Sequence, residues 1–335
     1  MDELTLLKIG VNPLQRKMPI KRLPESVISR IAAGEVITSP YNIIKELLEN
    51  SLDAHSTSIT ISIDSSLKNL SIRDNGAGIE KDDLEFLCLN HYTSKIQSIE
   101  DLKKYGSITS SSCFGFRGEA LHSISLCSHI KIQTKTSPLE RCDVKDGMGH
   151  VAIYNSDRLI DVKECAFDGH GTFIEIKNIF YNNTIRSEYF SKNRVELLNC
   201  IELVAYYGII YNSIECKVDN KVILGRDPCE RGMSHDIDKT IENRKGYILK
   251  NILNSKNFLG KNEHLRSFYR FRNSKSHCVV DEGFIIICSE LNAVFKSSKF
   301  ILFVNRRLVK NDSLKNRVLQ KYRCLKKGCV PFAIY

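Results

Sequence analysis

The chain has 335 residues, of which 42% are hydrophobic and 26% charged, a composition that argues against wholesale disorder. Its length allows two domains, each with a hydrophobic core of its own. The opening stretch MDELTLLKIG is too acidic and too weakly apolar for a signal peptide, and no apolar run approaches the roughly 20 residues that span a bilayer. The 12 cysteines form no CxxC pair, so we expect reduced thiols in a cytosolic or nuclear protein and no zinc site.

The net charge of +10 is unevenly distributed along the chain. Residues 1–200 carry 24 Lys and Arg against 26 Asp and Glu, a net charge of −2, whereas residues 201–335 carry 25 against 13, a net charge of +12. A basic half joined to a near-neutral half favours a polyanionic partner, with nucleic acid the first candidate. A solvated basic surface without a partner is the alternative interpretation.

The hydrophobic patterns predict short helices and strands in the first part of the chain. Ser39 and Pro40 supply an N-cap and a first-turn proline for a helix that runs through the stretch KELLENSLDA (45–54). In chain order we predict a loose tail over 1–18, a helix over 24–34 ended by Gly34, the KELLENSLDA helix, strands over 57–64 and 69–74 followed by a glycine turn in DNGAG, a helical stretch over 81–92, and a serine-rich loop over 106–113.

Strands dominate the remainder of the chain. In chain order we predict strands over 129–136, 149–154 and 171–181, a helix over 194–211 that closes the first domain, strands near 214–218, 280–288 and 300–304, and a helix over 313–325. These elements show no regular βαβ alternation and no internal repeat. We therefore expect an α+β sandwich rather than a doubly wound sheet.

Four polar residues of the KELLENSLDA helix share one face. At 100° per residue, they fall within an arc of about 100° opposite an apolar side; they are Glu46, Glu49, Asn50 and Asp53. A carboxylate at Glu46 could orient and deprotonate a water for attack on a terminal phosphoryl group, and the Asn50 amide oxygen could complete the shell of a Mg²⁺ that bridges the phosphates. For this helix judged alone, a solvated outer face is the simpler alternative.

Phosphate binding would require a device other than the common nucleotide motifs. The sequence holds no GxxxxGK[ST] motif, and GMGHVA (147–152) does not open a helix after a strand, so we expect a turn there. In GFRGEAL (115–121), two glycines precede a helix whose free N–H groups attract phosphate oxygens, although a GxxG turn capping an ordinary helix is equally compatible. In DNGAG, Asp74 could accept from an exocyclic amine, with Gly76 and Gly78 leaving room for a flat base, although a plain loop at a strand end is the simpler interpretation.

The ordered series of these motifs is more specific than any one of them. The acidic helix, DNGAG, YTSK (92–95), GFRGEAL and GT (171–172) follow one another as in the GHKL ATPase superfamily of type II topoisomerases, the ninety-kilodalton heat-shock chaperone and sensor histidine kinases. RIAAGEVITSP, KELLENSLDAHST, RDNGAGI, YTSKI, FGFRGEALHSIS and IFYNNTIR together resemble the MutL mismatch-repair family over roughly residues 19–335. AHSTSI, IFYN and ILFVNRRLV favour its eukaryotic homologue that forms the common subunit of heterodimers.

The resemblance implies a fold and a cellular role. It implies a GHKL-type ATPase sandwich over residues 19–212, with a mixed, largely antiparallel sheet and helices on one face, and a basic, ribosomal-protein-like βα domain over residues 213–335. ATP and Mg²⁺ would be the cofactors, and ATP would order a lid, pair two N-terminal domains and close a clamp around double-stranded DNA. The expected partners are DNA, a second MutL-type subunit and mismatch-recognition proteins, and the expected compartment is the nucleus.

The resemblance also implies residue roles. Glu46 would be the general base, Asn50 the Mg²⁺ ligand, and Asp74 the reader of adenine. The other residues of the expected ATP pocket are Asp53 as a buttress, Gly76, Gly78, Thr93, Ser94, Lys95, Thr172 at the adenine end, and a phosphate-contacting lid of Gly115, Phe116, Arg117, Gly118 and Glu119. Arg307 in VNRRLV matches the family's DNA-contacting arginine.

Three departures from the family pattern bear on activity. The stretch between DLKKYG and FGFRGEA is longer than usual, which would slow lid closure, and Arg306 stands where many members have glycine. The sequence ends at VPFAIY, before the segment whose lysine reaches the γ-phosphate in the family and before the family's dimerisation and endonuclease region. We therefore expect a weak ATPase without nuclease activity. Its rivals are an ATP-binding DNA-matchmaking module with little turnover and a chaperone or topoisomerase ATPase, against which IAAGEV and GFRGEAL argue.

Overall fold

The computed structural model covers most of the first 225 residues and parts of the remainder. Described are residues 20–96, 98, 113–115, 117–137, 148–211, 213–225, 265–272, 282–288, 299–304, 306–314, 316, 317 and 320. The predicted tail, most of the serine-rich loop and the end of the predicted helix over 313–325 lie outside these residues. In the part described, no helix is long and apolar enough to cross a membrane.

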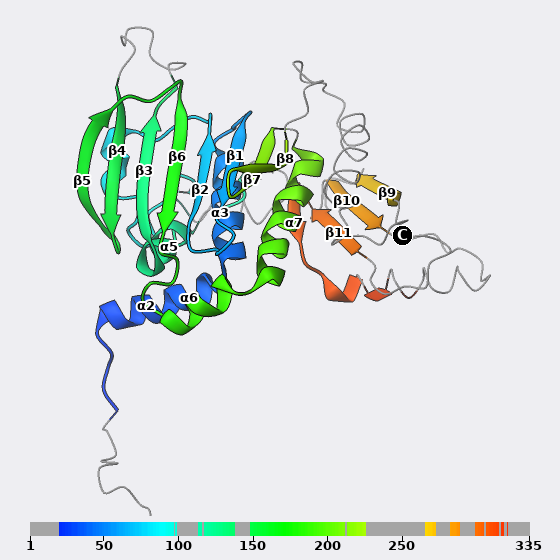
Figure 1. Cartoon of the computed structure of the whole chain (residues 1–335), viewed down its shortest axis with the longest axis horizontal. Helices are drawn as coiled ribbons and strands as arrows, with labels where there is room; N and C mark the ends of the chain where they lie inside the picture. Colours follow the sequence, from blue (N-terminus) through cyan, green and yellow to red (C-terminus); the bar gives the residue numbers. More distant parts are fainter. Residues whose placement is uncertain are drawn as a thin grey trace, which may run out of the picture.

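An eight-stranded sheet forms the larger part of the described structure (Figure 1). Its strand order is β5-β4-β3-β6-β2-β1-β7-β8, and all neighbours are antiparallel except β1 and β7. The strands are β1 (Ile59–Ile63), β2 (Leu70–Asp74), β3 (His129–Lys135), β4 (Gly149–Asn155), β5 (Arg158–Cys165), β6 (Gly171–Lys177), β7 (Ile214–Val218) and β8 (Lys221–Leu224). This order confirms the expected mixed, largely antiparallel sheet.

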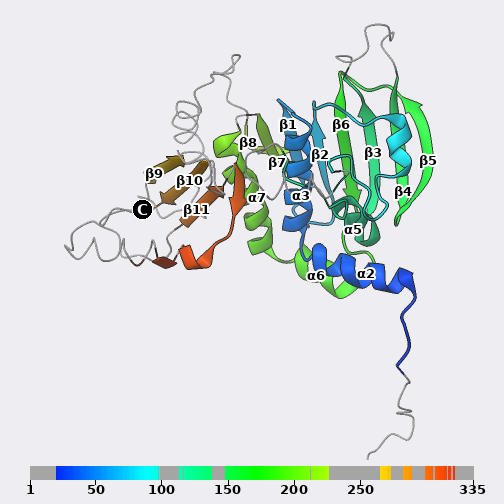
Figure 2. The same ribbon diagram turned by 180° about the vertical axis from the view of Figure 1, so that it is seen from behind.

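Helices cover one face of this sheet. Along β1, Ile59, Ile61 and Ile63 are buried whereas Thr60 and Ser62 are partly exposed, which is the period of two expected for a strand with one face against a core. Helices α3 (Pro40–Asp53), α5 (Ala120–Cys127) and α7 (Arg194–Ile210) contact the strands on that face. Helix α3 lies behind the sheet in Figure 1 and in front of it in Figure 2.

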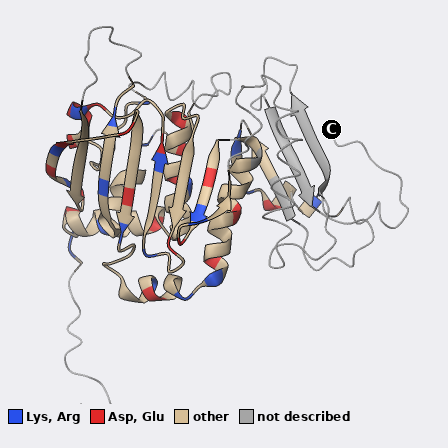
Figure 3. Cartoon of the chain, turned by 45° about the horizontal axis from the view of Figure 1, so that its top comes forward, with Lys and Arg blue, Asp and Glu red and all other residues tan. Residues whose placement is uncertain are grey.

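Positively and negatively charged residues occur along the strands of this sheet (Figure 3). Two ion pairs join residues two apart on one strand, Glu175 with Lys177 on β6 and Glu215 with Lys217 on β7, each with an N–O distance of 3.0 Å. Side chains two apart on a strand point to the same face. The sheet therefore has one apolar face under the helices and one polar face.

The second half of α7 is enclosed on several sides. Leu203, Val204, Ala205 and Tyr207 are each 0% exposed, because α7 packs against α3 and β7 and its Tyr207 ring meets the Phe303 ring at a centroid distance of 5.9 Å. The helix predicted over 194–211 is confirmed.

A second sheet has the order β12-β11-β10-β9, with every pair antiparallel. Its strands are β9 (Leu265–Arg272), β10 (Glu282–Cys288), β11 (Lys299–Val304) and β12 (Arg307–Val309). Phe303 of β11 is fully buried in the core formed by the first sheet and its helices, and Leu308 of β12 packs against that core. The strands predicted near 280–288 and 300–304 are confirmed, whereas β9 and β12 were not predicted. The ribosomal-protein-like domain stays a prediction.

The predicted domain boundary at residue 212 falls inside the first sheet. Strand β7 pairs with β1 in parallel, with Ile59 opposite Ile214 and Ile63 opposite Val218, and β8 pairs with β7. Strands β7 and β8 therefore belong to the first sheet, and the division of the chain into two domains stays a prediction.

The predicted helical stretch over 81–92 is wrong. It contains only the short 3₁₀ helix η1 (Lys81–Glu85), followed by turns. The Leu84 carbonyl accepts from the Tyr154 hydroxyl at 2.7 Å, and the Cys88 carbonyl lies 2.9 Å from His122 Nδ1. Side chains from β4 and α5 thus satisfy carbonyls that an α-helix would bond internally.

Other element boundaries differ from the predictions. Helix α2 (Glu25–Val36) continues through Gly34, and β6 ends at Lys177, before Asn178 and Phe180 with positive φ angles of 54° and 61°. The turn predicted at 147–152 is wrong at Gly149, where β4 begins. Strands β5 and β8 and helix α6 (Thr184–Ser191) were not predicted.

Candidate nucleotide-binding site

Helix α3 presents apolar side chains to the core and polar side chains to the expected pocket. Pro40 occupies its first turn, and the Ser39 N–H donates to Asn42 Oδ1 at 3.2 Å, which fixes where the helix starts. Ile44 and Leu47 are each 1% exposed. Because the apolar side is held by the core, it sets the direction in which the polar side faces.

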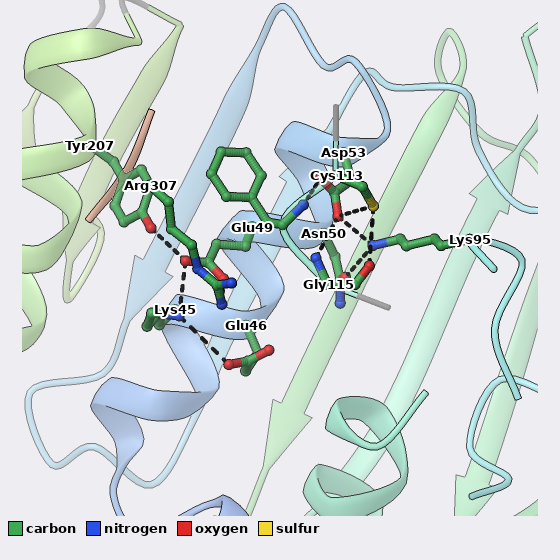
Figure 4. Close-up of polar contacts among 11 residues, drawn as sticks. Lys45, Glu46, Glu49, Asn50, Asp53, Lys95, Cys113, Gly115, Tyr207 and Arg307 are labelled. Atoms are coloured by element: carbon green, nitrogen blue, oxygen red, sulfur yellow. Dashed lines mark hydrogen bonds and ion pairs between the residues drawn. The ribbon is translucent and has the colours of Figure 1, made fainter. Parts of the chain in front are cut away.

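Asn50, Asp53 and Lys95 meet at the centre of the site (Figure 4). Lys95 Nζ donates to Asn50 Oδ1 at 3.0 Å and to Asp53 Oδ2 at 2.5 Å. The Asp53 side chain is 4% exposed and the Lys95 side chain 24%. The YTSK segment is therefore brought against α3, as the motif order implied. Within that segment Thr93 Oγ1 accepts from the Lys95 N–H at 3.2 Å, and Ser94 lies between them.

Asp53 also fastens the segment that leads into GFRGEAL. Its Oδ1 accepts from the Phe114 N–H at 2.6 Å, and its Oδ2 accepts from the Gly115 N–H and from the Cys113 thiol, both at 3.2 Å. Burial raises the pKa of the Cys113 thiol to about 11, so this thiol is a neutral donor near pH 7. The arrangement suits the expected buttress role of Asp53, and Cys113 is a contact that the sequence analysis missed.

The start of α5 forms the remaining part of the expected lid. Gly118 has a φ of +64°, and a Cβ there would lie 2.3 Å from the Tyr92 carbonyl oxygen, so only glycine fits this close approach. Glu119 directly precedes α5, and Arg117 is exposed. The predicted lid residue Phe116 lies outside the described residues.

Asp74 is held at the end of β2 by three hydrogen bonds. Its Oδ2 accepts from Ser51 Oγ at 2.8 Å, and its Oδ1 accepts from the Gly76 N–H at 2.9 Å and the Thr172 N–H at 3.2 Å. The side chain is buried, and this burial raises its pKa above the ordinary value. Ser51 was missed by the sequence analysis, although it follows Asn50 on α3.

A buried threonine joins the glycine turn to the strand behind it. Thr134 Oγ1 accepts from the Ile79 N–H at 2.9 Å, donates to the Gly171 carbonyl at 3.0 Å, and lies 3.3 Å from Thr172 Oγ1. Gly78, with a φ of +77°, packs so closely on Lys135 that a Cβ would lie 2.3 Å from its carbonyl oxygen. The turn is therefore fixed by backbone packing and by one hydroxyl that no motif indicates.

The predicted acidic arc of α3 divides into two environments. Glu46 is 32% exposed, and its Oε1 lies 3.8 Å from Lys45 Nζ. Glu49 is 2% exposed and accepts from the Tyr207 hydroxyl at 2.5 Å, Lys45 Nζ at 2.9 Å and Arg307 Nη2 at 3.0 Å. Glu46 is thus partly exposed, whereas Glu49 belongs to a buried network (Figure 4).

The oxygen atoms around Lys95 suit a magnesium ion. The ammonium group stands in for a cation, because it is bound by the Asn50 amide oxygen and the Asp53 carboxylate together. Mg²⁺ in nucleotide sites is bound through one or two protein oxygens plus phosphate oxygens and waters. The donor set therefore fits Mg²⁺ held by Asn50 together with a nucleotide.

Comparison with known proteins identifies a matching family and similar relatives. Residues 37–172 match the family described as "Histidine kinase-, DNA gyrase B-, and HSP90-like ATPase". The DNA mismatch repair protein Mlh1 of Dictyostelium discoideum is 32% identical over 339 residues, which cover 95% of this chain and 36% of that protein. The DNA mismatch repair protein MutL of Elusimicrobium minutum is 36% identical over 234 residues, which cover 69% of this chain and 35% of that protein. The chain spans about a third of the length of these relatives.

Solved structures share the fold. A structure described as the N-terminal domain of a DNA repair protein has a TM-score of 0.57 at 22% identity, over 88% of this chain and 82% of that one. The Aquifex aeolicus MutL ATPase domain complexed with ADP has a TM-score of 0.53 at 17% identity, over 85% of this chain and 88% of that one. The sandwich of α3, α5 and α7 on a largely antiparallel sheet is thus the ATPase fold of this group. The chain belongs to the MutL/Mlh1 family of DNA mismatch-repair proteins and carries their histidine kinase-, gyrase- and HSP90-like ATPase domain.

Proposed function

We propose that this chain binds ATP with Mg²⁺, hydrolyses it slowly, and uses the nucleotide state to control a clamp on DNA in mismatch repair. The observation that carries the proposal is that α3 serves all parts of the site. It bears Glu46 and Asn50 one turn apart, and through Ser51 it holds the buried Asp74 at 2.8 Å. A single helix therefore fixes, relative to one another, the residues to which we assign base reading, metal binding and general-base catalysis.

Each of these groups has a distinct task in the proposed reaction. The Asp74 carboxylate accepts from the adenine amine, and its two backbone N–H donors keep it oriented. Asn50 Oδ1 is a ligand of Mg²⁺, which supplies charge neutralisation at the phosphates. Glu46 orients and deprotonates the attacking water. Lys95, now bound to Asn50 and Asp53, would transfer to phosphate oxygens when nucleotide enters.

The lid and the partners extend this proposal beyond the site. Gly115 to Glu119 would close over the phosphates. Asp53 already holds the backbone at Phe114 and Gly115, where this lid begins. Lid closure would pair two N-terminal domains, and Arg307 with the basic half of the chain would contact double-stranded DNA. A second MutL-type subunit, mismatch-recognition proteins and a nuclear location complete the proposed role, supported by the similarity to Mlh1 of Dictyostelium discoideum.

A second candidate is an ATP-binding DNA-matchmaking module with little turnover. Lysines engage both residues that hydrolysis needs, since Lys45 lies 3.8 Å from Glu46 and Lys95 lies 3.0 Å from Asn50. Nucleotide could bind through Asp74 and leave Glu46 in this pairing. Turnover separates the two candidates.

The first experiment compares ATP binding and Mg²⁺-dependent turnover in the wild type, the Glu46→Ala variant and a Glu188→Ala control on the exposed side of α6. We expect slow turnover in the wild type and the control, and its loss in Glu46→Ala with ATP binding retained. Binding without turnover in all three proteins supports the matchmaking module. A wild type that binds no ATP contradicts the proposed function.

A further inference from the structure

Glu49 lies at the meeting point of three elements that are distant in sequence. It belongs to α3, its Oε1 accepts from Tyr207 on α7, and its Oε2 accepts from Arg307 on β12, 258 residues away (Figure 4). Lys45 on α3 adds a bond of 2.9 Å to Oε1. Within the described residues, Arg307 is the donor that reaches Oε2.

The network is built for a buried charge. A carboxylate that is 2% exposed is costly unless cations and hydrogen-bond donors surround it. Burial raises the pKa of Tyr207, and the adjacent Glu49 raises it further, so the phenol remains a neutral donor. Arg307 is 41% exposed and therefore brings its charge from the surface into contact with the core.

The hairpin that carries Arg307 is anchored independently of this ion pair. Phe303 is fully buried against Tyr207, and Leu308 packs on the same core. Lys310 Nζ lies 4.9 Å from the centroid of the Tyr41 ring at the start of α3. Because contacts on both sides of Arg307 fix the strand, its guanidinium is held at a set place beside α3.

We propose that Arg307 is a positioning residue for ATP hydrolysis, acting through Glu49 on the turn of α3 that carries Glu46 and Asn50. The inference rests on the proposed ATPase function. Arg307 shares Glu49 with Lys45, and Lys45 also lies 3.8 Å from Glu46. When Arg307 is removed, Lys45 is the cation left beside Glu49 in the described structure. Its ammonium group then moves toward Glu49 and away from Glu46, which changes the position and electrostatic environment of the Glu46 carboxylate.

The test is a double-mutant cycle that combines Arg307→Met with Glu49→Gln. We expect Arg307→Met to lower kcat at least tenfold, since small displacements of catalytic groups slow reactions strongly. The KM for ATP should change less than twofold, because Asp74 binds the base at the other end of the site. In the Glu49→Gln background, Arg307→Met should have no further effect. Arg307→Lys should recover part of the lost kcat.

Arg306→Met is the matched control. It removes the same charge from the neighbouring position of the same hairpin, where the side chain is exposed, and it should leave kcat unchanged. If Arg307→Met alone unfolds the protein, the double variant Arg307→Met with Glu49→Gln leaves no unpaired buried carboxylate and is compared with Glu49→Gln alone.

The outcomes separate this inference from the proposed function. An equal fall in kcat for Arg307→Met in both backgrounds, or an effect on KM alone, overturns the positioning role while ATP turnover stands. A wild type that binds no ATP overturns both. If the wild type binds ATP without turnover, the readout becomes the Mg²⁺ concentration that half-saturates ATP binding. A rise of this concentration in Arg307→Met that disappears in the Glu49→Gln background supports the inference. An unchanged concentration in Arg307→Met overturns it.

Discussion

The Asp74 carboxylate is buried, which opposes the stability of the fold. Its charge is removed from water at the end of β2, and the burial raises its pKa although Ser51, Gly76 and Thr172 donate to it. A carboxylate at this position opposes folding near neutral pH, and it would offer an acceptor to the adenine amine of the proposed nucleotide. Recognition and stability therefore place opposite demands on this residue.

Asp74→Asn should separate these two demands. The amide oxygen can still accept from Gly76 and Thr172, and the Ser51 hydroxyl can rotate to accept from the new NH₂ group. We expect the free energy of unfolding at pH 7 to be unchanged or raised by about 1 kcal/mol. ATP affinity should fall at least about tenfold, because two NH₂ groups would face each other. Urea unfolding and nucleotide titration measure the two effects, and an unchanged ATP affinity would contradict the assignment of Asp74.

The stability effect of Asp74→Asn should depend on pH in a fixed direction. Because the pKa of Asp74 is raised in the folded state above its ordinary value of 3.8, folding binds protons, and wild-type stability falls as pH rises between those two values. The difference between variant and wild type should thus be small below pH 3.8 and complete above the folded pKa. The pKa of Asp64 is shifted in the opposite direction, below the ordinary value.

Asp64→Asn should weaken the fold near pH 7. Burial opposes the Asp64 charge, but hydrogen bonds from Ser66 and Asn69 outweigh it and lower the pKa below the ordinary value of 3.8. The stabilisation by this carboxylate is present above 3.8 and is lost as pH falls through its folded pKa. We expect a loss of about 1 kcal/mol at pH 7, measured by urea unfolding, which shrinks in acid. A variant as stable as the wild type at pH 7 would contradict this.

At the scale of elements, the hairpin between β11 and β12 carries a strained residue. Val304 pairs with Arg307, and between them Arg306 has a φ of +63°. Two-residue hairpin loops require positive φ angles, which glycine adopts without cost. The resemblance described above implied glycine at this position, and the hairpin forms here with arginine.

Arg306→Gly should stabilise the protein by about 0.5–1 kcal/mol, because relief of the left-handed conformation exceeds the added freedom of the unfolded chain. Arg306→Ala is the control, since it removes the charge and keeps the conformational cost. Chemical unfolding of the three proteins provides the comparison. An equal gain in Arg306→Ala would attribute the stabilisation to charge removal.

Elements with regular periodicity were predictable, and those decided by distant contacts were not. The apolar side and polar side of α3 follow from its sequence, and the structure confirms the helix from Pro40 to Asp53. The stretch over 81–92 has a helical pattern, yet Tyr154 and His122 take two of its carbonyls. The different fates of Glu46 and Glu49, which share an arc, depend on Tyr207 and Arg307 far along the chain.

For the site, motif order was informative where single residues were not. It placed Lys95 in the same pocket as Asn50 and Asp53, and the structure brings the three side chains into contact. Ser51 and Thr134 hold Asp74 and the glycine turn, but a serine in a helix and a threonine in a strand carry no sequence signal of that role. The roles of these hydroxyl groups depend on which helices and strands pack together, so the sequence alone does not predict them.

For the whole molecule, the uneven charge leads to a prediction for DNA binding. The half from residue 201 onward has a net charge of +12, so affinity for double-stranded DNA should fall steeply with salt, with a slope of log K against log salt of about −4 or steeper. The DNA-contacting role proposed for Arg307 predicts that Arg307→Met reduces that slope by about 1. An unchanged slope in this variant would assign the guanidinium to its ion pair with Glu49 alone. Arg73→Met, in the near-neutral half, should leave the slope unchanged. A slope near zero for the wild type would contradict DNA binding by the basic half.

The parallel pair of β1 and β7 has a consequence for synthesis of the protein. Strand β1 and the antiparallel β2 leave the ribosome early, yet the other edge of β1 waits for Ile214 to Val218. Until then a strand with three buried isoleucines has an unpaired edge, the kind of surface that pairs with other chains. Helix α3 is likewise covered by α7 only after residues 194–210 have been made. A nascent chain halted before β7 should therefore need a chaperone, although every motif of its nucleotide pocket has already been translated.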